Sequence, residues 1–248
     1  MLKKLTVLFM VALLVAACGS GAPSTPSPGQ GAPTSAAPGE LKLVSQWKNN
    51  ERFEYQVLAS QDGSNAGSGV VEITLASDAT TIEQTYQFGE VTQHMLTKVN
   101  PRNLRPISGL LELSGTPNAF TLTSEYRDGK LSVKAKTADS DKSATVDIAV
   151  DAIDNDSALM VLRNLPLGDG FSVPFENAVA SGAAQVQATL TVTGRETVSV
   201  PAGTFETYKV QLSFGGGQPQ TVWYEVAAPH RMIQYDNGNT KFVLTKSS

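Results

Sequence analysis

Apolar and polar residues alternate along most of the chain beyond residue 41, and short turn signals separate the alternating stretches. A period of two is typical of strands that bury one face, and frequent turns favour antiparallel neighbours. The pattern predicts strands over residues 53–59, 70–75, 81–88, 92–99, 144–150, 186–193, 205–214 and 221–226. With two further hairpins this makes roughly a dozen strands, too many for a flat open sheet. We therefore expect an all-β fold in which one large antiparallel sheet curls into a half-barrel or barrel-like form.

The clearest hairpin turns at Asp128-Gly129, a dipeptide that favours a two-residue turn. The pairs expected on its apolar face are Tyr126–Leu131, Ser124–Val133 and Leu122–Ala135, and those on its polar face are Arg127–Lys130 and Thr123–Lys134. Because Arg127 and Lys130 carry like charges, we expect both to splay into solvent. Asn237-Gly238 predicts a second hairpin of the same kind.

One segment breaks the strand pattern. Residues 154–170, DNDSALMVLRNLPLGDG, offer Asp156 or Ser157 as a helix N-cap, and leucines follow at near-helical spacing. Pro166 and Gly168 then end the helix. We expect a short amphipathic helix that plugs an open end of the curled sheet.

The N-terminus follows a different pattern. Lys3 and Lys4 precede an uncharged run of 13 residues, Leu5–Ala17, which is shorter than the 20 or so residues that span a bilayer. The run fits the apolar core of a secretory signal peptide. Residues 15–18, Val-Ala-Ala-Cys, resemble a bacterial lipobox, which implies cleavage after residue 17 and a diacylglycerol thioether on Cys18.

Two other interpretations of Cys18 stay open. It can follow an ordinary signal peptide by chance, or it can be a catalytic thiol, which needs a partner base that its neighbours do not supply. If it is lipidated, the remaining domain has no thiol and no disulfide, and its fold rests on core burial.

Residues 18–40 are expected to be the lipidated cysteine and a disordered tether rich in Pro, Gly and Ser. The tether reaches roughly 25 Å as a coil and about 70 Å as extended polyproline. A proline-rich docking site is the alternative, although flanking basic or aromatic anchors are missing. Residues 41–248 are expected to form a single β-rich domain, held outside the cytoplasm on the outer face of a bacterial membrane.

The charge of the chain limits its partners. The formal net charge is −4, and loss of the expected signal peptide leaves 17 basic and 23 acidic side chains, a charge of −6. No basic run occurs, so we expect no nucleic-acid partner and no electrostatic docking on anionic lipid. Contact with the membrane is left to the lipid on Cys18.

The sequence offers little catalytic chemistry. The chain has two histidines, His94 and His230, and no G-x-S-x-G motif, so we expect no hydrolase and no other enzyme. Without cysteine or paired histidine ligands, no zinc site and no cofactor are expected.

The acidic stretch DAIDND, residues 151–156, invites comparison with calcium loops. Asp154 and Asp156 have the initial spacing, but Ala158 takes the next ligand position, so it is not an EF-hand. A looser oxygen cage that includes Asp139 or Asp141 stays open. We prefer a polar loop that leads into a capped helix.

Three stretches carry a family resemblance: VSVPAGTFETYKVQLSF at 198–214, TVWYEVAAPHRMIQYD at 221–236 and KVNPRNLRPISG at 98–109. They resemble an uncharacterised family of β-rich bacterial envelope proteins, a catalogued domain of unknown function, over about residues 50–246. The resemblance implies a large curled antiparallel sheet, loosely similar to the half-barrels that carry lipoproteins and lipids. It offers no catalytic residues. From the residues alone, Pro201 ends a strand, Gly203 supplies a turn and Phe205 re-enters the core.

Aromatic residues gather in the C-terminal third, and inward-facing ones can line an apolar groove or fill a core. The candidate ligand-binding residues are Trp223, Phe205 and Tyr208; Trp223 and Tyr224 must face opposite sides of their strand. Two interpretations result. The first is a non-catalytic module that binds a lipid or other hydrophobic ligand on its concave face. The second is an envelope scaffold with a solid core that binds protein or polysaccharide. They differ in whether the concave face is open or filled by its own side chains.

Overall fold

The computed structural model describes residue 41 and residues 43–248. The expected signal peptide, Cys18 and the tether lie outside the described residues. Within the described part, fifteen strands belong to one sheet with the order β8-β7-β6-β5-β4-β3-β2-β1-β15-β14-β13-β12-β11-β10-β9. Neighbouring strands are antiparallel except β9 and β10, which run parallel. The predicted all-β class with one large, mostly antiparallel sheet is confirmed.

Two meanders build the sheet. The first consists of β1 (Glu51–Ala59), β2 (Asn65–Leu75), β3 (Thr80–Phe88), β4 (Val91–Val99), β5 (Pro106–Ser114), β6 (Phe120–Arg127), β7 (Lys130–Thr137) and β8 (Asp141–Asp147). The second consists of β10 (Ser172–Val179), β11 (Ala184–Val200), β12 (Gly203–Phe214), β13 (Gln220–Glu225), β14 (Met232–Asp236) and β15 (Thr240–Ser247), with the 3-10 turn η1 (Ala180–Gly182) after β10. Between the meanders, a connecting segment holds β9 (Ile153–Asp154) and the helix α1 (Ala158–Leu162). Strands β1 and β15 pair and join the two meanders.

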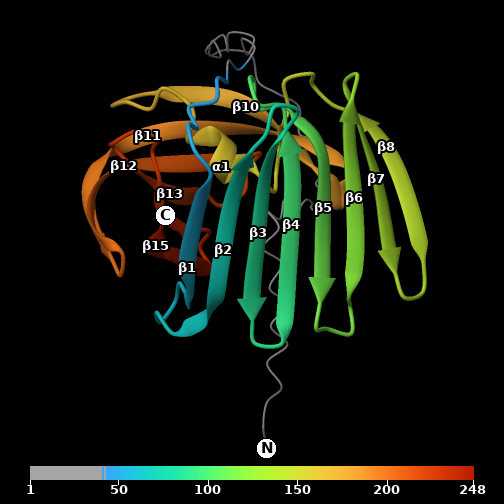
Figure 1. The fold of residues 1–248 in the computed structure, drawn as a ribbon, viewed down its shortest axis with the longest axis horizontal. Coiled ribbons are helices and arrows are strands. Elements are labelled where there is room, and N and C mark those ends of the chain that lie inside the picture. The colour runs from blue at the N-terminus through green and yellow to red at the C-terminus, as the bar shows by residue number, and fades with distance from the viewer. Residues whose placement is uncertain (1–40, 42) are drawn as a thin grey trace, which may run out of the picture.

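The sheet curls but does not close. Figure 1 shows β1 to β8 spread across the front, the second meander behind them, and α1 between the two layers. The two ends of the sheet are β8 and β9. The Ala149 amide, just after β8, donates to Gln185 Oε1 on β11 and so links the end of the first meander to the second. No helix among residues 41 and 43–248 is long and apolar enough to cross a membrane.

The predicted hairpins are confirmed in position and pairing. In the first, Tyr126 lies opposite Leu131, and Asp128 and Gly129 have φ values of 52° and 70°, as a tight primed turn requires. The expected splaying is only partly right, because Lys130 Nζ lies 2.6 Å from Asp147 Oδ1 on the next strand. The second hairpin joins β14 to β15 around Asn237-Gly238.

Three strands were not predicted: β5, β9 and β10. The proline at position 174 argues against a strand, yet β10 lies near the end of the sheet and β9 covers it only at Asn177 and Ala178. A proline fits at position 174 because β9 does not reach it, so no strand on that side needs its backbone N–H as a donor. The predicted strands at 144–150 and 186–193 are also displaced or short, since β8 covers Asp141–Asp147 and β11 runs to Val200.

The helix begins where the sequence places it but ends at Leu162, before the expected stop at Pro166. Its N-cap is Ser157, whose side chain makes no capping hydrogen bond; instead Asp154 Oδ1 accepts the Ser157 amide at 2.9 Å. Tyr224 Oη on β13 donates to the Leu159 carbonyl at 2.6 Å, and Gln84 Nε2 on β3 donates to the Asp156 carbonyl at 2.6 Å. The helix is therefore fixed to both layers, inside the curl.

Aromatic rings fill the concave face beside the helix. Tyr86 meets Phe242 edge-on at 5.3 Å between ring centroids, and Tyr235 lies 5.7 Å from Phe242. On β2, Gly69 leaves room for this cluster, because a Cβ there would lie 2.5 Å from the Tyr86 ring. Exposed large apolar side chains in the described residues are few and scattered: Val44, Ile107 and Val150. The inward side chains, then, are covered by one another and by α1.

Candidate functional site

Residues 43–50, here called the strap, cross the end of the curled sheet where β1 begins. Leu43 and Trp47 are buried. The Gln46 amide donates to Asn164 Oδ1 at 2.8 Å, and Gln46 Nε2 donates to the Asn164 carbonyl at 2.9 Å. The strap is thereby fixed to the residues just after α1.

A pocket of about 780 Å³ opens between the strap, the β13–β14 loop and the end of β15. We call it the mouth pocket. Its wall includes Gln46, Lys48, Glu51, Phe53, Arg231 and Ser247. The volume lies within the range of small-molecule sites, roughly 300–1,000 Å³. Most of the residues that line the pocket are polar or charged, although more than half of its exposed wall is apolar.

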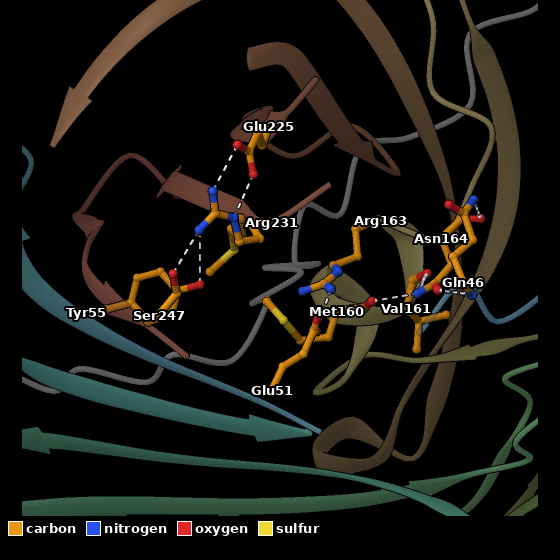
Figure 2. A network of polar contacts seen from close by, with 11 residues as sticks. Gln46, Glu51, Tyr55, Met160, Val161, Arg163, Asn164, Glu225, Arg231 and Ser247 are labelled. Atoms are coloured by element: carbon orange, nitrogen blue, oxygen red, sulfur yellow. Dashed lines mark hydrogen bonds and ion pairs between the residues drawn. The ribbon is translucent and has the colours of Figure 1, made fainter. Parts of the chain in front are cut away.

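Behind the pocket wall lies a fully buried cation, Arg163. Its Nη2 lies 2.5 Å from Glu51 Oε2, and the Glu51 side chain is 15% exposed. Its Cζ lies 5.3 Å from the centroid of the Phe53 ring and 6.0 Å from that of Trp47. Figure 2 shows the Arg163 guanidinium, from the residue just after α1, directed toward Glu51. A buried guanidinium needs such a partner, because removing the partner leaves a desolvated charge uncompensated.

Three donors of this cluster have no hydrogen-bond acceptor among the described residues: Arg163 Nε, Arg163 Nη1 and Trp47 Nε1. Native proteins leave few buried polar atoms without a partner, so three donors around one cation are unusual.

A second guanidinium, Arg231, forms part of the pocket wall itself. It donates to both carboxylate oxygens of Glu225, at 2.6 and 2.9 Å, and to Ser247 Oγ at 2.8 Å (Figure 2). Hydrogen bonding to Glu225 raises the pKa of Arg231. Its Cζ lies 5.2 Å from the centroid of the Phe205 ring. Three of the five N–H donors of this arginine are therefore engaged, and its guanidinium is held in place.

The VPAGTF stretch forms the tip of the β11–β12 hairpin, next to this arginine. The Ala202 amide donates to the Leu244 carbonyl of β15 at 3.1 Å. Gly203 has φ 139°, a conformation that favours glycine. The Phe205 ring then packs against Arg231. In this structure the motif docks a hairpin tip onto β15 and supports the pocket wall.

The three predicted ligand-binding residues make different contacts. Trp223 faces the outside of the sheet, where Lys209 Nζ lies 5.6 Å from its ring centroid and Glu196 accepts from its Nε1. Its neighbour Tyr224 faces inward. Tyr208 contacts Arg195 and His230, with Arg195 Cζ 4.9 Å from its ring centroid. None of Trp223, Phe205 and Tyr208 lines the mouth pocket, although Phe205 lies directly behind it. Their part in ligand binding stays a prediction.

The acidic segment before α1 is satisfied by protein donors. Asp154 accepts from Thr97 Oγ1 at 3.0 Å and from Tyr126 Oη at 2.6 Å. Burial, with Asp154 adding to it, raises the pKa of Asp156 to about 7. In the described part of the chain no group of three or more His, Cys, Asp and Glu is placed to hold a metal ion. Asp139 and Asp141 lie exposed at the β7–β8 turn.

The two histidines lie in different surroundings. His94 lies on the outer face between Glu83, at 2.8 Å, and Glu112, at 3.2 Å. Burial alone would lower the pKa of His94, but hydrogen bonds to Glu112 and Glu83 outweigh it and raise the pKa. His230 Nδ1 lies 2.9 Å from the Glu225 carbonyl in the β13–β14 loop. Both rings therefore make structural contacts.

Sequence reasoning missed the residues of the mouth pocket. One signal was present: Arg163 interrupts the apolar positions MVL-R-NL of the helical segment. Long charged residues are almost never fully buried unless paired, so an arginine there predicts a distant carboxylate partner. The pattern does not say that the partner is Glu51, 112 residues earlier.

The architecture defines a class of protein: a large antiparallel sheet, curled but open, around one short helix. The chain itself matches the family described as "Protein of unknown function (DUF3108)" over residues 53–245, and it belongs to that family. This match confirms the resemblance seen in the sequence.

Of two solved structures that match this chain, only the first has a TM-score above 0.5. The first is the crystal structure of a β-barrel-like protein of domain of unknown function DUF1849 from Brucella abortus. It has a TM-score of 0.58 and 13% identity, with 84% of this chain and 98% of that chain covered. The second, a putative exported protein with a YmcC-like fold from Bacteroides fragilis, has a TM-score of 0.34 and 10% identity, with 84% and 100% covered. A search of curated protein sequences found no significant match. At these identities the likeness concerns the fold alone.

Proposed function

We propose that the protein is a non-catalytic binding module of the bacterial cell envelope, lipid-anchored through Cys18, and that it holds its ligand in the mouth pocket. The observation that carries this proposal is the pocket of about 780 Å³ between the strap and the β13–β14 loop. Its wall, fixed by Arg231 and Glu225, offers a preorganised set of hydrogen-bonding groups.

The concave face is filled by the protein's own side chains, which favours a module with a solid core over one with an open groove. The aromatic cluster and α1 cover the inward side chains, so a lipid lying along that face would have to displace them. Close-packed interiors resist such displacement. We therefore propose binding in the mouth pocket. A protein that carries an acyl chain on its concave face is the second candidate function.

The position of the strap links this site to the expected anchor. The strap is close behind the expected tether in the sequence, and it contributes Gln46 and Lys48 to the pocket wall. A domain on a tether of roughly 25–70 Å searches only the space near its membrane. The ligand we expect is thus another component of the envelope.

Native mass spectrometry of the full-length protein, purified in mild detergent, tests the binding proposal. We expect a near-equimolar species bound to the wild type and lost on Arg231→Gln, since that change removes the pocket's fixed guanidinium. Arg195→Gln, an exposed arginine paired with Asp169, is the matched control. A wild-type protein without any bound species, and without a change in melting temperature on adding envelope extract, contradicts the proposal.

Membrane fractionation tests the anchor separately. Cys18→Ser removes the only thiol of the chain. We expect the variant to leave the membrane fraction, because a single unlipidated segment of 13 apolar residues does not hold a protein stably in a bilayer. A variant that stays in the membrane fraction refutes lipidation.

A further inference from the structure

The unpartnered groups behind the mouth pocket are all donors. Arg163 is fully buried, and its Nε and Nη1 have no acceptor; the Trp47 indole N–H, on a ring 6.0 Å away, has none either. Glu51 and Phe53, which contact Arg163, form part of the pocket wall. A group that satisfied these donors would have to be an acceptor, and Glu51 and Phe53 are the wall residues that separate Arg163 from the pocket.

The charges around the pocket favour an anion. The side chains that line the pocket or lie directly behind it supply three positive charges, on Lys48, Arg163 and Arg231, and two negative charges, on Glu51 and Glu225. This local surplus of positive side chains contrasts with the formal net charge of −4 of the whole chain. Lys48 is exposed at the rim, where it can meet an approaching anion.

Arg231 is the more fully engaged of the two arginines. Its Nε and Nη2 are occupied by Glu225, and its Nη1 by Ser247. Arg163 holds its single carboxylate through Nη2 and keeps two nitrogen donors unused. A planar guanidinium binds carboxylates and phosphates best through two parallel N–H groups. In Arg163 both such pairs include Nη2, so an incoming anion can use a parallel pair once it takes the place of Glu51.

We propose that the mouth pocket binds its ligand through an anionic oxygen group, a carboxylate or a phosphate, which replaces Glu51 against Arg163. This inference rests on the proposed function of the mouth pocket. The exchange swaps one anion for another, so the buried guanidinium is never left unpaired. Glu51 is on the pocket wall and 15% exposed, so its side chain can turn outward into the pocket's solvent. Trp47 Nε1 supplies a further donor to the incoming group.

A charge-neutral variant of Glu51 gives the sharpest test. In the full-length protein we would measure the melting temperature of Glu51→Gln against added sodium phosphate, sodium acetate and glycerol 3-phosphate, at constant ionic strength set with sodium chloride. We expect the variant to melt below the wild type without these anions and to recover with them. Its apparent affinity for the anion should be about tenfold higher than that of the wild type, because the competing carboxylate is gone.

Glu72→Gln is the matched control, since Glu72 pairs with an exposed arginine, Arg52, on the neighbouring strand. It should show the wild-type response. Arg163→Gln should abolish the anion response.

The two tryptophans of the chain provide a readout in the wild-type protein that needs no variant. In ¹⁵N-tryptophan-labelled protein, the indole N–H signal of Trp47 should move as phosphate is added. The indole of Trp223, already bonded to Glu196, should stay still and serves as the internal reference.

The outcomes separate the two proposals. Equal anion responses of Glu51→Gln and Glu72→Gln, with a Trp47 signal that does not move, overturn the inference. If mass spectrometry still finds a bound species that depends on Arg231, the proposed function stands with a neutral ligand. A response to phosphatidylglycerol vesicles but not to glycerol 3-phosphate assigns the anion to a lipid headgroup; a response to both assigns it to a small ligand.

Discussion

The polar groups of this protein fall into two regions with opposite physics. Around α1, charged and polar side chains are buried: Arg163 against Glu51, and Asp154 against Thr97 and Tyr126. On the outer face of the first meander, both side chains of an ion pair are exposed, as in the contact of Lys130 with Asp147. The bonds have similar lengths in the two regions, so geometry alone does not distinguish them.

Solvent makes the difference. The charges of an exposed ion pair stay largely hydrated and are screened by solvent, so the pair contributes little to stability. A buried charge has lost its hydration, so its partner cannot be removed without leaving that loss uncompensated. The connecting segment is therefore the part of the molecule where polar residues decide the conformation, and the outer face is where they mainly provide solubility.

The largest effect is expected from the two halves of the buried pair. Glu51→Ala leaves a fully buried guanidinium without a counterion and should cost about 3–5 kcal/mol in the free energy of unfolding. Arg163→Met should cost less, about 1–2 kcal/mol, because Glu51 can turn into the mouth pocket and Met fills the space. Urea unfolding of both variants measures the asymmetry. Equal costs would contradict our account of Glu51 as the more accessible partner.

The next effect depends on pH and concerns Asp156. Its folded-state pKa of about 7 lies above the ordinary value of 3.8, so the folded protein holds a proton that the unfolded chain releases. The stabilisation that comes from this proton on Asp156 is fully present below about pH 4 and is lost as the pH rises through about 7. Asp156→Asn should therefore be stabler than the wild type by about 2 kcal/mol at pH 8, with little difference at pH 4.

Denaturant titrations at both pH values measure this change. Asp147→Asn is the control, since hydrogen bonding to Lys130 lowers the pKa of Asp147 and gives the opposite sign. A difference for Asp156→Asn that does not grow with pH would count against burial as the cause.

His94 tests an ion pair whose exposure lies between those of the buried and the exposed pairs. Its pKa is raised above 6.5, so its contribution is full below about pH 6.5 and is lost as the pH rises through the raised pKa. Because Glu83 and Glu112 are 43% and 45% exposed, solvent screens the pairs. We expect His94→Gln to lose about 0.5 kcal/mol at pH 5.5 and nothing at pH 9. Thermal unfolding at low and high salt measures both the pH dependence and the screening.

The smallest effect is expected at Lys130. Its partner Asp147 is 86% exposed, so Lys130→Ala should leave the melting temperature unchanged within error. Differential scanning calorimetry of this variant beside Glu51→Ala gives the two extremes of the comparison. A clear loss of stability for Lys130→Ala would show that the outer face depends on its charges after all.

Local patterns explain which parts of the fold were predictable. The Asp128-Gly129 hairpin was predicted down to its residue pairs, because turn chemistry and alternation act within a few residues. Strand β10 was missed because its proline is tolerated only through its place near the sheet's end, which the local sequence does not reveal. That one of Trp223 and Tyr224 faces inward was predictable; that it is Tyr224 depends on the contact with α1.

The mouth pocket was not predictable from local patterns. Its wall joins residues near 45–53 to residues near 228–231 and 247, and its buried cation comes from a third segment at residue 163. No period or motif relates these segments, because they meet only through the curl of the sheet. The aromatic residues are conspicuous in the sequence, but their contacts are not. The structure places Tyr86 against Phe242 and Trp223 against Lys209, and the part of Trp223, Phe205 and Tyr208 in ligand binding stays a prediction.

The pairing of β1 with β15 has a consequence for folding kinetics. Within each meander, neighbouring strands follow one another in the chain and can assemble early from contacts of low sequence separation. The β1–β15 seam has the highest contact order in the sheet, since Phe53 pairs with Ser247. Glu51 on β1 and Ser247 on β15 lie on opposite sides of that seam and both line the mouth pocket. A ligand bound there would contact both strands of this long-range pairing, and we expect it to slow unfolding and so prolong the lifetime of the native state.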